Sequence, residues 1–223
     1  MKIKKSELNQ NIHLSEGNIK SKCTDNIMFL TWSLPSRTTC PYATGMCKSK
    51  CFAKKNESFK SVRESRQRNL DETSKDSFIE DMIKHFKYHL QRPKAKDKLI
   101  IVRIHTSGDF YCLDYFSKWV KISDYFKEND KILFQAYTKS MPILMDYGNL
   151  EDVNIHLVWS IWHDTPAEFT GKALELGLQT FTALPKDEID EAVNKGAFLC
   201  NGDCGTCKEC YTGESKNIVI PYH

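Results

Sequence analysis

The sequence predicts an α/β protein whose main body is a partial (βα) barrel of about five to six parallel strands, similar to part of a TIM barrel. Apolar segments of strand length recur along the chain, and between them lie segments whose apolar residues repeat at helical spacing. Alternating strands and helices form parallel sheets, because each helix returns the chain to the same end of the sheet. An open doubly wound sheet is the alternative that fits the same alternation.

Five segments have the composition of buried strands, being rich in β-branched and aromatic residues, and Pro35 closes the first of them. They are residues 26–34, 99–107, 131–138, 153–161 and 178–184. Helices are predicted where apolar residues recur at helical spacing and where proline or glycine marks an end. They cover about 57–70, 74–91, 115–126, a short stretch from 142, 166–176 and 187–194.

Length and composition limit the classes of protein. The 223 residues, 40% hydrophobic and 27% charged, suit an ordinary globular protein with one large body. We expect an irregular segment at 1–25, the βα domain at 26–199 with a cysteine loop at 40–51, and a cysteine-rich metal-binding tail at 200–223. The net charge of +3 does not by itself indicate nucleic acid. No apolar run reaches the roughly 20 residues of a membrane span, and no signal peptide is expected, so the prediction is a cytoplasmic protein without membrane contact.

Seven of the nine cysteines fall into two groups near opposite ends of the chain. In a reducing compartment, dense cysteines bind metal more often than they form disulfides, and an odd total suits disulfides poorly. Three or four thiolates tolerate one another in one place only when a cation offsets their charge. The predicted metal ligands are Cys40, Cys47 and Cys51 in the first group, and Cys200, Cys204, Cys207 and Cys210 in the second.

The spacing within the second group favours iron–sulfur over zinc. Its pattern, C-x3-C-x2-C-x2-C, is as compact as the runs that enclose a [4Fe-4S] cluster, whereas zinc sites generally use two separated CxxC knuckles. In such runs the fourth cysteine can serve another cluster. Zinc is the alternative that the residues leave open.

The first group has three cysteines, which would leave one iron of a [4Fe-4S] cluster without a protein ligand. An open iron can bind a cofactor or a substrate, and it is therefore the main sign of catalysis in the sequence. The alternative is a closed site whose fourth ligand is Cys23, Cys210 or a histidine. Cys112 lies in an apolar stretch and is expected to be a core residue.

Polar residues follow several predicted strands, where ligands bind in sheets of this kind. His105 is a candidate general base, metal ligand or substrate contact, and Lys139 a candidate partner for a carboxylate or phosphate. A buried structural histidine and a solvated lysine are the alternatives. Trp159, Trp162 and Phe181 are expected in the core, although Trp162 could also line a pocket.

Three cysteines after the first strand of a βα-repeat chain resemble the radical S-adenosylmethionine superfamily. Its members bind a [4Fe-4S] cluster through three cysteines at the start of a partial (βα)6 barrel, and the open iron binds the amino and carboxyl groups of the cofactor. The superfamily spacing is C-x3-C-x2-C, whereas this loop has C-x6-C-x3-C. Cys200, Cys204 and Cys207 have the superfamily spacing but lie at the other end of the chain.

More narrowly, TCPYATGMCKSKCFAKK, RIHTSGDFY, FQAYTKS and the cysteine-rich tail resemble the phage gene product 88 family, over about residues 30–222. This resemblance implies an origin in a mobile element and supplies no established reaction.

The superfamily resemblance implies roles for individual residues. Ser107, Gly108 and Asp109 take the place of a glycine-glycine-glutamate motif that contacts the amino group of the cofactor. The tail cysteines would hold a second cluster that binds substrate or relays electrons, and an electron donor such as ferredoxin or flavodoxin would be a partner. The candidate site is then catalytic His105, Asp109 and Lys139, with cofactor contacts from Ser107, Gly108, Asp109, Thr138 and Ser160.

A second interpretation needs no catalysis. Arg63, Arg66 and Arg68 recur at helical spacing and could contact nucleic-acid phosphates. The chain would then be a nucleic-acid-binding protein of a phage or mobile element, stabilised by iron–sulfur or zinc. Neighbouring acidic residues dilute this charge, so a solvated helix face is the simpler reading.

Overall fold

The predicted strands form one sheet in the structure, a computed structural model that describes residues 2–18, 21–213 and 215–222. Within these residues the sheet has eight strands in the order β1-β2-β3-β4-β5-β6-β8-β7, and only β1 is antiparallel to its neighbour. The strands are β1 (Ser15–Glu16), β2 (Ile27–Ser33), β3 (Leu99–Ser107), β4 (Ile132–Thr138), β5 (His156–Ile161), β6 (Gln179–Leu184), β7 (Phe198–Leu199) and β8 (Asn217–Pro221).

The strand order runs in one direction from β2 to β6, without reversal. A doubly wound sheet reverses its order at a switch point, so that alternative is wrong. Among the described residues, β1 and β7 are the two edges and do not pair with each other, and the sheet is therefore open.

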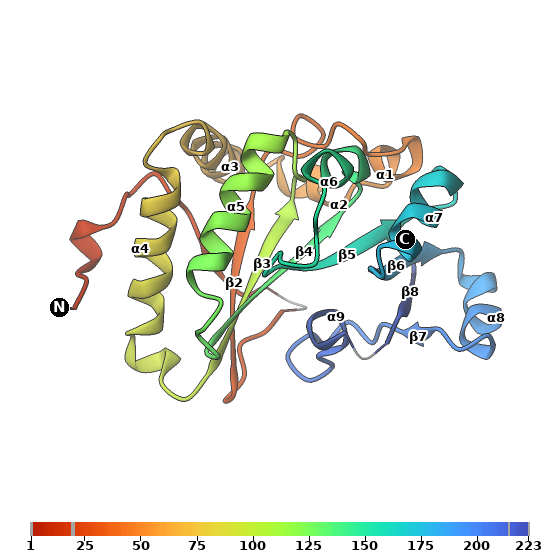
Figure 1. Ribbon diagram of the computed structural model, residues 1–223. Coiled ribbons are helices and arrows are strands. Elements are labelled where there is room, and N and C mark those ends of the chain that lie inside the picture. Colours follow the sequence, from red (N-terminus) through yellow and green to blue (C-terminus); the bar gives the residue numbers. More distant parts are fainter. Residues whose placement is uncertain (1, 19–20, 214, 223) are drawn as a thin grey trace.

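Helices follow the strands as the sequence predicts, and Figure 1 shows α3, α4, α5 and α6 gathered along the strands from β2 to β5. Two short helices were not predicted: α1 lies within the cysteine loop, and α2 lies directly after it. In the described part of the chain no helix has the length and apolar character needed to cross a membrane. The α-helices are α1 (Gly45–Ser49), α2 (Phe52–Asn56), α3 (Lys60–Thr73), α4 (Phe78–Leu90), α5 (Leu113–Tyr125), α6 (Met141–Tyr147), α7 (Ala167–Glu175), α8 (Ile189–Asn194) and α9 (Glu209–Thr212), and the 3-10 helices are η1 (Lys5–Glu7), η2 (Pro93–Ala95) and η3 (Lys186–Glu188).

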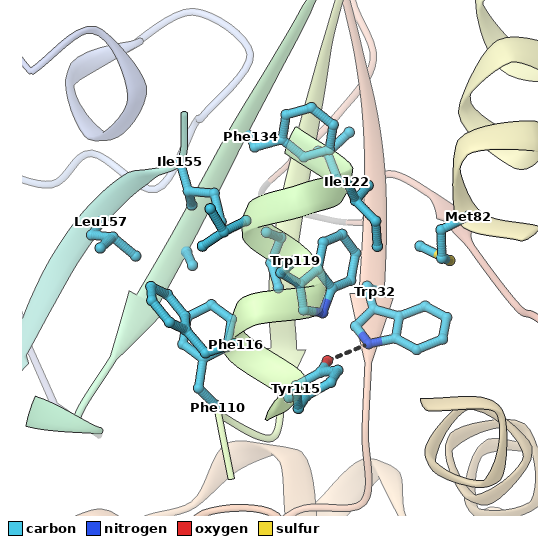
Figure 2. Packing of buried hydrophobic residues seen from close by; sticks show 14 of the residues in the cluster. Trp32, Met82, Phe110, Tyr115, Phe116, Trp119, Ile122, Phe134, Ile155 and Leu157 are labelled. Atoms are coloured by element: carbon cyan, nitrogen blue, oxygen red, sulfur yellow. Dashed lines mark hydrogen bonds between the residues drawn. The ribbon is translucent and has the colours of Figure 1, made fainter. Parts of the chain in front are cut away.

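The main core lies between the helices and one face of the sheet. Trp32 of β2 and alternate residues of β3 point to this side, as the period of two in a strand requires. Trp119 of α5 is the centre of an aromatic cluster whose rings lie 6.0 to 6.5 Å away, and the Trp32 indole donates a 2.9 Å hydrogen bond to the Tyr115 hydroxyl (Figure 2). The other rings of the cluster are Phe78 and Phe86.

The opposite face of the sheet is different, because its buried apolar cluster is small and lies near the amino ends of β2 and β3. Phe29 and Ile101 pack there against Tyr211 of α9. Farther along the strands, this face carries polar and aromatic side chains that line a cavity. The sheet thus separates a helix-covered core from a face that is available for binding.

A bulge in β3 changes the direction of its last residues. Thr31 pairs with Arg103, but Ser33 pairs with Ser107, so two steps along β2 match four along β3. Within this bulge His105 has a φ of +65°, which is unfavourable for a residue with a side chain and costs about 1–3 kcal/mol. Its ring packs against Phe110 in the helix-side core. Bulges of this kind re-aim side chains beside binding sites.

Two strands were not assigned by the sequence analysis: β7, which directly precedes the cysteine-rich tail, and β8, which lies within it. β8 inserts between β6 and β7, and all of these pairings are parallel. Ile218 and Val219 of β8 are buried. The tail is therefore joined to the sheet by backbone hydrogen bonds as well as by the packing of α9.

Helix α4 contributes two buried histidines beside its apolar stripe. Burial lowers the pKa of His89 to about 4, with further lowering by the neighbouring Arg92 and His85. Burial also lowers the pKa of His85. Glu16 lies 3.8 Å from Nδ1 of His89 but is itself paired with Arg92 and Lys94. Both histidines are therefore neutral in the folded protein near pH 7.

We expect Trp119→Ala to lower the free energy of unfolding by about 3–5 kcal/mol, because it leaves a cavity among fully buried rings. Leu174→Ala, at a side chain on α7 that is 58% exposed, is the control and should change it by less than about 0.5 kcal/mol. Urea unfolding measures both. Equal effects in the two variants would contradict the assigned core.

The pKa of His89 predicts acid lability. Because the folded-state pKa of about 4 lies below the ordinary value of 6.5, the unfolded chain takes up the proton first. The contribution of neutral His89 to the free energy of unfolding is complete above pH 6.5. As the pH falls toward 4, up to about 3 kcal/mol of it is lost. The unfolding free energy of His89→Gln should fall less over this range than that of the wild type. His163→Gln, at an exposed site, is the control and should behave as the wild type does.

Candidate functional site

Both cysteine groups line the same cavity, although about 150 residues separate them in the sequence. The cavity has a volume of about 630 Å³ and lies on the sheet face opposite the helix-side core. Its walls come from the cysteine loop, the last residues of β3, β4, β5 and β6, and the tail. The cysteines that line it are Cys40, Cys47, Cys51, Cys200, Cys204, Cys207 and Cys210.

The cysteine loop begins directly after β2, as the sequence predicts. Thr44 caps α1, because its hydroxyl accepts a hydrogen bond from the Cys47 amide at 3.2 Å, and Cys51 is the N-cap residue of α2. Asp164, in the loop after β5, accepts a 2.6 Å hydrogen bond from the Met46 amide. These contacts fix the backbone on which the second and third cysteines lie.

A buried ion pair fixes the base of the loop. Glu57 accepts hydrogen bonds from the amide and the hydroxyl of Ser36, both at 2.6 Å, and from the Arg66 guanidinium at 2.7 Å. Burial opposes ionisation of Glu57, but these hydrogen bonds outweigh it and hold the pKa of the carboxyl below its ordinary value. Arg66 also donates to the Ala53 carbonyl. Its role is therefore to hold α2 and α3 together.

The predicted nucleic-acid residues do not share one exposed surface. Arg66 is buried in the ion pair with Glu57, while Arg63 is exposed and donates to the carbonyls of Glu57 and Ser58. Arg68 is also exposed and makes none of these local hydrogen bonds.

Ser107, Gly108 and Asp109 form a tight turn that contacts the cysteine loop. The Leu34 amide donates to the Ser107 carbonyl at 2.8 Å, and the Asp109 amide donates to the Thr39 carbonyl at 3.0 Å. Gly108 has a φ of +89°, and a Cβ added there would lie 2.7 Å from both Leu34 Cβ and Thr39 Oγ1. Only glycine fits this close approach without movement of the loop.

Asp109 is buried and accepts three hydrogen bonds. Thr138 Oγ1 and the Phe110 amide donate to Oδ1, both at 2.7 Å, and the Lys139 amide donates to Oδ2 at 2.8 Å. Burial raises the pKa of the carboxyl to about 6, against the lowering effect of these donors. Oδ2 keeps capacity for one further donor. Thr138 thus orients Asp109 in this structure.

Lys139 is buried, so the alternative of a solvated lysine is wrong. Its ammonium donates to the carbonyl of Ser160 at 2.6 Å and to the hydroxyl of Ser160 at 3.0 Å. Burial lowers its pKa to about 8, although the nearby Cys47 and Asp109 favour the charged form. A cation is therefore held beside the thiols of the loop.

The ring of His105 faces the core, and its Nε2 lies 2.9 Å from the Tyr115 hydroxyl. That hydroxyl already accepts a hydrogen bond from Trp32. The other ring nitrogen, Nδ1, is buried and has no hydrogen-bond partner among the described residues, and His105 is one of the residues that line the cavity. Burial lowers the pKa of His105 to about 3. This geometry gives His105 a structural contact.

The thiols within each group lie close enough to affect one another electrostatically. Burial, then Asp109, raises the pKa of Cys40 to about 12, and Cys47 and Cys51 contribute to the same direction. In the tail, burial raises the pKa of Cys210 to about 12, with contributions from Cys200 and Cys204. Ionising a whole group would therefore require a cation. Among the described residues, no three potential ligands converge at the spacing of a single metal ion.

The other two cysteines lie elsewhere. Cys23 is exposed and does not line the cavity. Cys112 is half-buried and packs against the helix-side core, as expected from its apolar surroundings.

The sequence analysis missed two residues on the floor of the cavity. Arg103 and Gln135 lie in the middle of β3 and β4 and line the cavity, as does Tyr137 near the end of β4. A signal was present, because Arg103 and Gln135 interrupt otherwise apolar strand segments. Trp159 is in the core as expected, whereas Phe181 and Trp162 line the cavity, where Trp162 stacks on Tyr222.

The fold and the cavity together define a class: an α/β protein with one open, mostly parallel sheet and a cavity into which two cysteine groups converge. The chain belongs to the gene product 88 family, a phage-type family whose model matches residues 2–213. No curated protein and no solved structure matches the chain significantly.

We expect Gly108→Ala to destabilise the protein and to displace the cysteine loop, because the new methyl group would overlap Leu34 and Thr39. Gly148→Ala is a matched control, since Gly148 has a similar φ of +90° but no atom within 4 Å of an added Cβ. Both variants should lose about 1 kcal/mol of stability through backbone strain. Gly108→Ala should lose about 1–3 kcal/mol more through overpacking. Thermal unfolding measures the difference, and equal losses would argue against the close approach.

Proposed function

We propose that this chain is an iron–sulfur enzyme on a partial βα barrel. The three loop cysteines would hold a [4Fe-4S] cluster with one open iron, and the tail cysteines would hold a second cluster. The observation that carries the proposal is the convergence of both groups on one cavity of about 630 Å³. Separate structural sites would have no need to share a cavity that is large enough for a small molecule.

The donor set supports iron–sulfur binding. Thiolates are the usual ligands of such clusters, and the cavity contains cations that would offset their negative charge, Lys139 beside the loop and Arg103 beside the tail. The Lys139 ammonium lowers the pKa of Cys47 against the effect of burial, and Arg103 acts in the same direction on Cys210. These cations offset part of the effect of burial, which still raises the pKa of both thiols.

The cofactor in this proposal is of the S-adenosylmethionine kind. When bound, an open cluster of this type supplies an electron and a coordination site for the amino and carboxyl groups of the cofactor. The protein would contribute the turn at Ser107–Asp109, where Oδ2 of Asp109 can accept one more hydrogen bond. The remaining proton of the Lys139 ammonium can be donated to an anionic group, while Ser160 holds that ammonium in place. An external reductant, such as ferredoxin or flavodoxin, would supply the electron.

The alternative is a metal-stabilised nucleic-acid-binding protein. What favours it is an exposed basic and aromatic surface in and after the cysteine loop, where Phe52 and Phe59 are each 65% exposed among lysines. The lysines are Lys48, Lys50, Lys54, Lys55 and Lys60. This alternative requires no open coordination position.

We expect protein purified without oxygen and reconstituted with iron and sulfide to contain about eight irons per chain, since two [4Fe-4S] clusters hold that number. Cys47→Ser should remove about half of the iron, and Cys207→Ser should remove the other half. Cys112→Ser and Cys23→Ser are matched controls outside the cavity and should retain all of it. Elemental analysis and visible absorption spectra provide the measurement.

The electron paramagnetic resonance spectrum of the reduced protein tests the open position. Adding S-adenosylmethionine should shift the signal of the wild type and of Cys207→Ser, but not that of Cys47→Ser. Zinc without iron in oxygen-free protein, together with salt-dependent binding to DNA or RNA, would overturn the enzyme proposal in favour of the alternative.

A further inference from the structure

Several buried polar atoms around the cavity have no hydrogen-bond partner in the part of the chain that the structure describes. They are Oγ of Ser21, Nε of Arg103, Nδ1 of His105, Oγ1 of Thr106, Oγ of Ser107 and Nε2 of Gln135. Each unsatisfied buried group costs about 1–3 kcal/mol. Ser107 and Gln135 are themselves 4% and 3% exposed. Six such atoms beside one cavity indicate that a polar ligand completes the hydrogen bonds of at least some of them.

Arg103 restricts the charge of that ligand. Its guanidinium lies 4.7 Å from the centre of the Tyr137 ring, over which it stacks. Within the described residues it forms no ion pair with a carboxylate. Asp203 and Glu209, which also line the cavity, accept hydrogen bonds from the amides of Gly205 and Ser215. A half-buried cation without a counter-ion favours an anionic ligand.

Gln135 restricts the geometry. Arg103 and Gln135 are direct partners in the parallel register of β3 and β4, and both line the cavity. Neighbouring strands lie about 4.8 Å apart, so the two side chains leave adjacent points of the same face. Gln135 lies near the Tyr137 hydroxyl, but its Nε2 makes no hydrogen bond there. Two adjacent N–H donors suit two oxygens of one carboxylate or phosphate group.

The position of this pair along β3 and β4 places it on the tail side of the cavity. Ser107 follows Arg103 by four residues, which is about 13 Å along a regular strand and somewhat less across the bulge. Tyr137, beneath the Arg103 guanidinium, interacts with the Cys210 thiol of the tail. The Arg103–Gln135 pair therefore lies toward the tail cysteines, and the Ser107 turn lies toward the cysteine loop.

We infer that the Arg103–Gln135 pair binds the anionic end of a small substrate, a carboxylate or a phosphate, whose remainder extends toward the cysteine loop. This inference rests on the proposed function where it calls the ligand a substrate, but the binding of the anion requires no cluster. Thr106 and Ser107 would donate to polar atoms farther along the ligand. The site selects small organic acids or phosphate esters.

A competing role for Arg103 is to offset the charge of the Cys210 thiolate, whose pKa it lowers. The two roles predict different results. If Arg103 serves as the counter-ion of the thiolate, it cannot bind an added anion. If Arg103 belongs to a substrate site, the protein should bind added anions, and a carboxylate introduced beside Arg103 should make it more stable.

The experiment uses the full chain, purified without oxygen, and measures the thermal unfolding midpoint with increasing malonate or inorganic phosphate. Sodium chloride at equal ionic strength is the control. We expect a saturable rise in the midpoint with at least one of the two anions, and the comparison distinguishes carboxylate from phosphate recognition. Arg103→Gln should weaken binding at least tenfold. Arg68→Gln, exposed and outside the cavity, should bind as the wild type does.

Gln135→Glu provides a second test that does not depend on a lost function. Its carboxylate would occupy the place of the ligand's anion, so the variant should be more stable than the wild type without anion and should no longer respond to malonate or phosphate. The gain should vanish in the double variant Arg103→Gln/Gln135→Glu. No saturable anion effect in the wild type, or a destabilised Gln135→Glu, would overturn the inference.

The two proposals fail separately. Eight irons per chain without anion binding would overturn the anion site and leave the iron–sulfur enzyme standing. Anion binding by a chain that takes up only zinc would overturn the iron–sulfur enzyme and leave the anion site standing.

Discussion

The close contact between the Ser107–Asp109 turn and the start of the cysteine loop is the constraint on which the site depends. Two backbone hydrogen bonds join the segments, and Gly108 leaves no room between them. This turn follows a bulge in β3, and Arg103 precedes the bulge on the same strand. The strand that holds the loop therefore also carries Arg103 on the floor of the cavity. One strand therefore sets the position of the loop cysteines relative to the rest of the cavity.

Buried charge is arranged along the same edge of the sheet. Asp109 and Lys139 are both buried, and each is held by neighbours from another strand or its end: Thr138 for the carboxylate and Ser160 for the ammonium. Unpaired, either charge would cost several kcal/mol to bury. The burial of both charges is tolerable because they lie near each other and because hydrogen bonds satisfy most of their donors and acceptors. This arrangement leaves one acceptor, Oδ2 of Asp109, and one donor, the Lys139 ammonium, that face the cysteine loop.

Much of the fold could be predicted from the sequence. The ends of the five strand segments lie within three residues of those of β2, β3, β4, β5 and β6, and the segment for β3 matches it in full, because a continuous apolar run bounded by proline or polar residues is a strong local signal. The short strand β8 was not predicted, since its run of Ile218, Val219 and Ile220 follows the tail cysteines and becomes a strand only by pairing with β6. The start of β5 at His156 likewise follows from its pairing with Gln135 of β4 rather than from composition.

For the site, the sequence by itself determined the candidate ligands and the loop that carries three of them, since residue type and spacing are local properties. It also placed polar residues at the carboxyl ends of the strands. The packed structure was needed to show that the two cysteine groups share a cavity, that Lys139 is buried, that the His105 ring packs against the core, and that Arg103 forms no ion pair with a carboxylate among the described residues. These depend on strand order, on the bulge in β3 and on which face each side chain occupies, and they arise only when distant segments pack together.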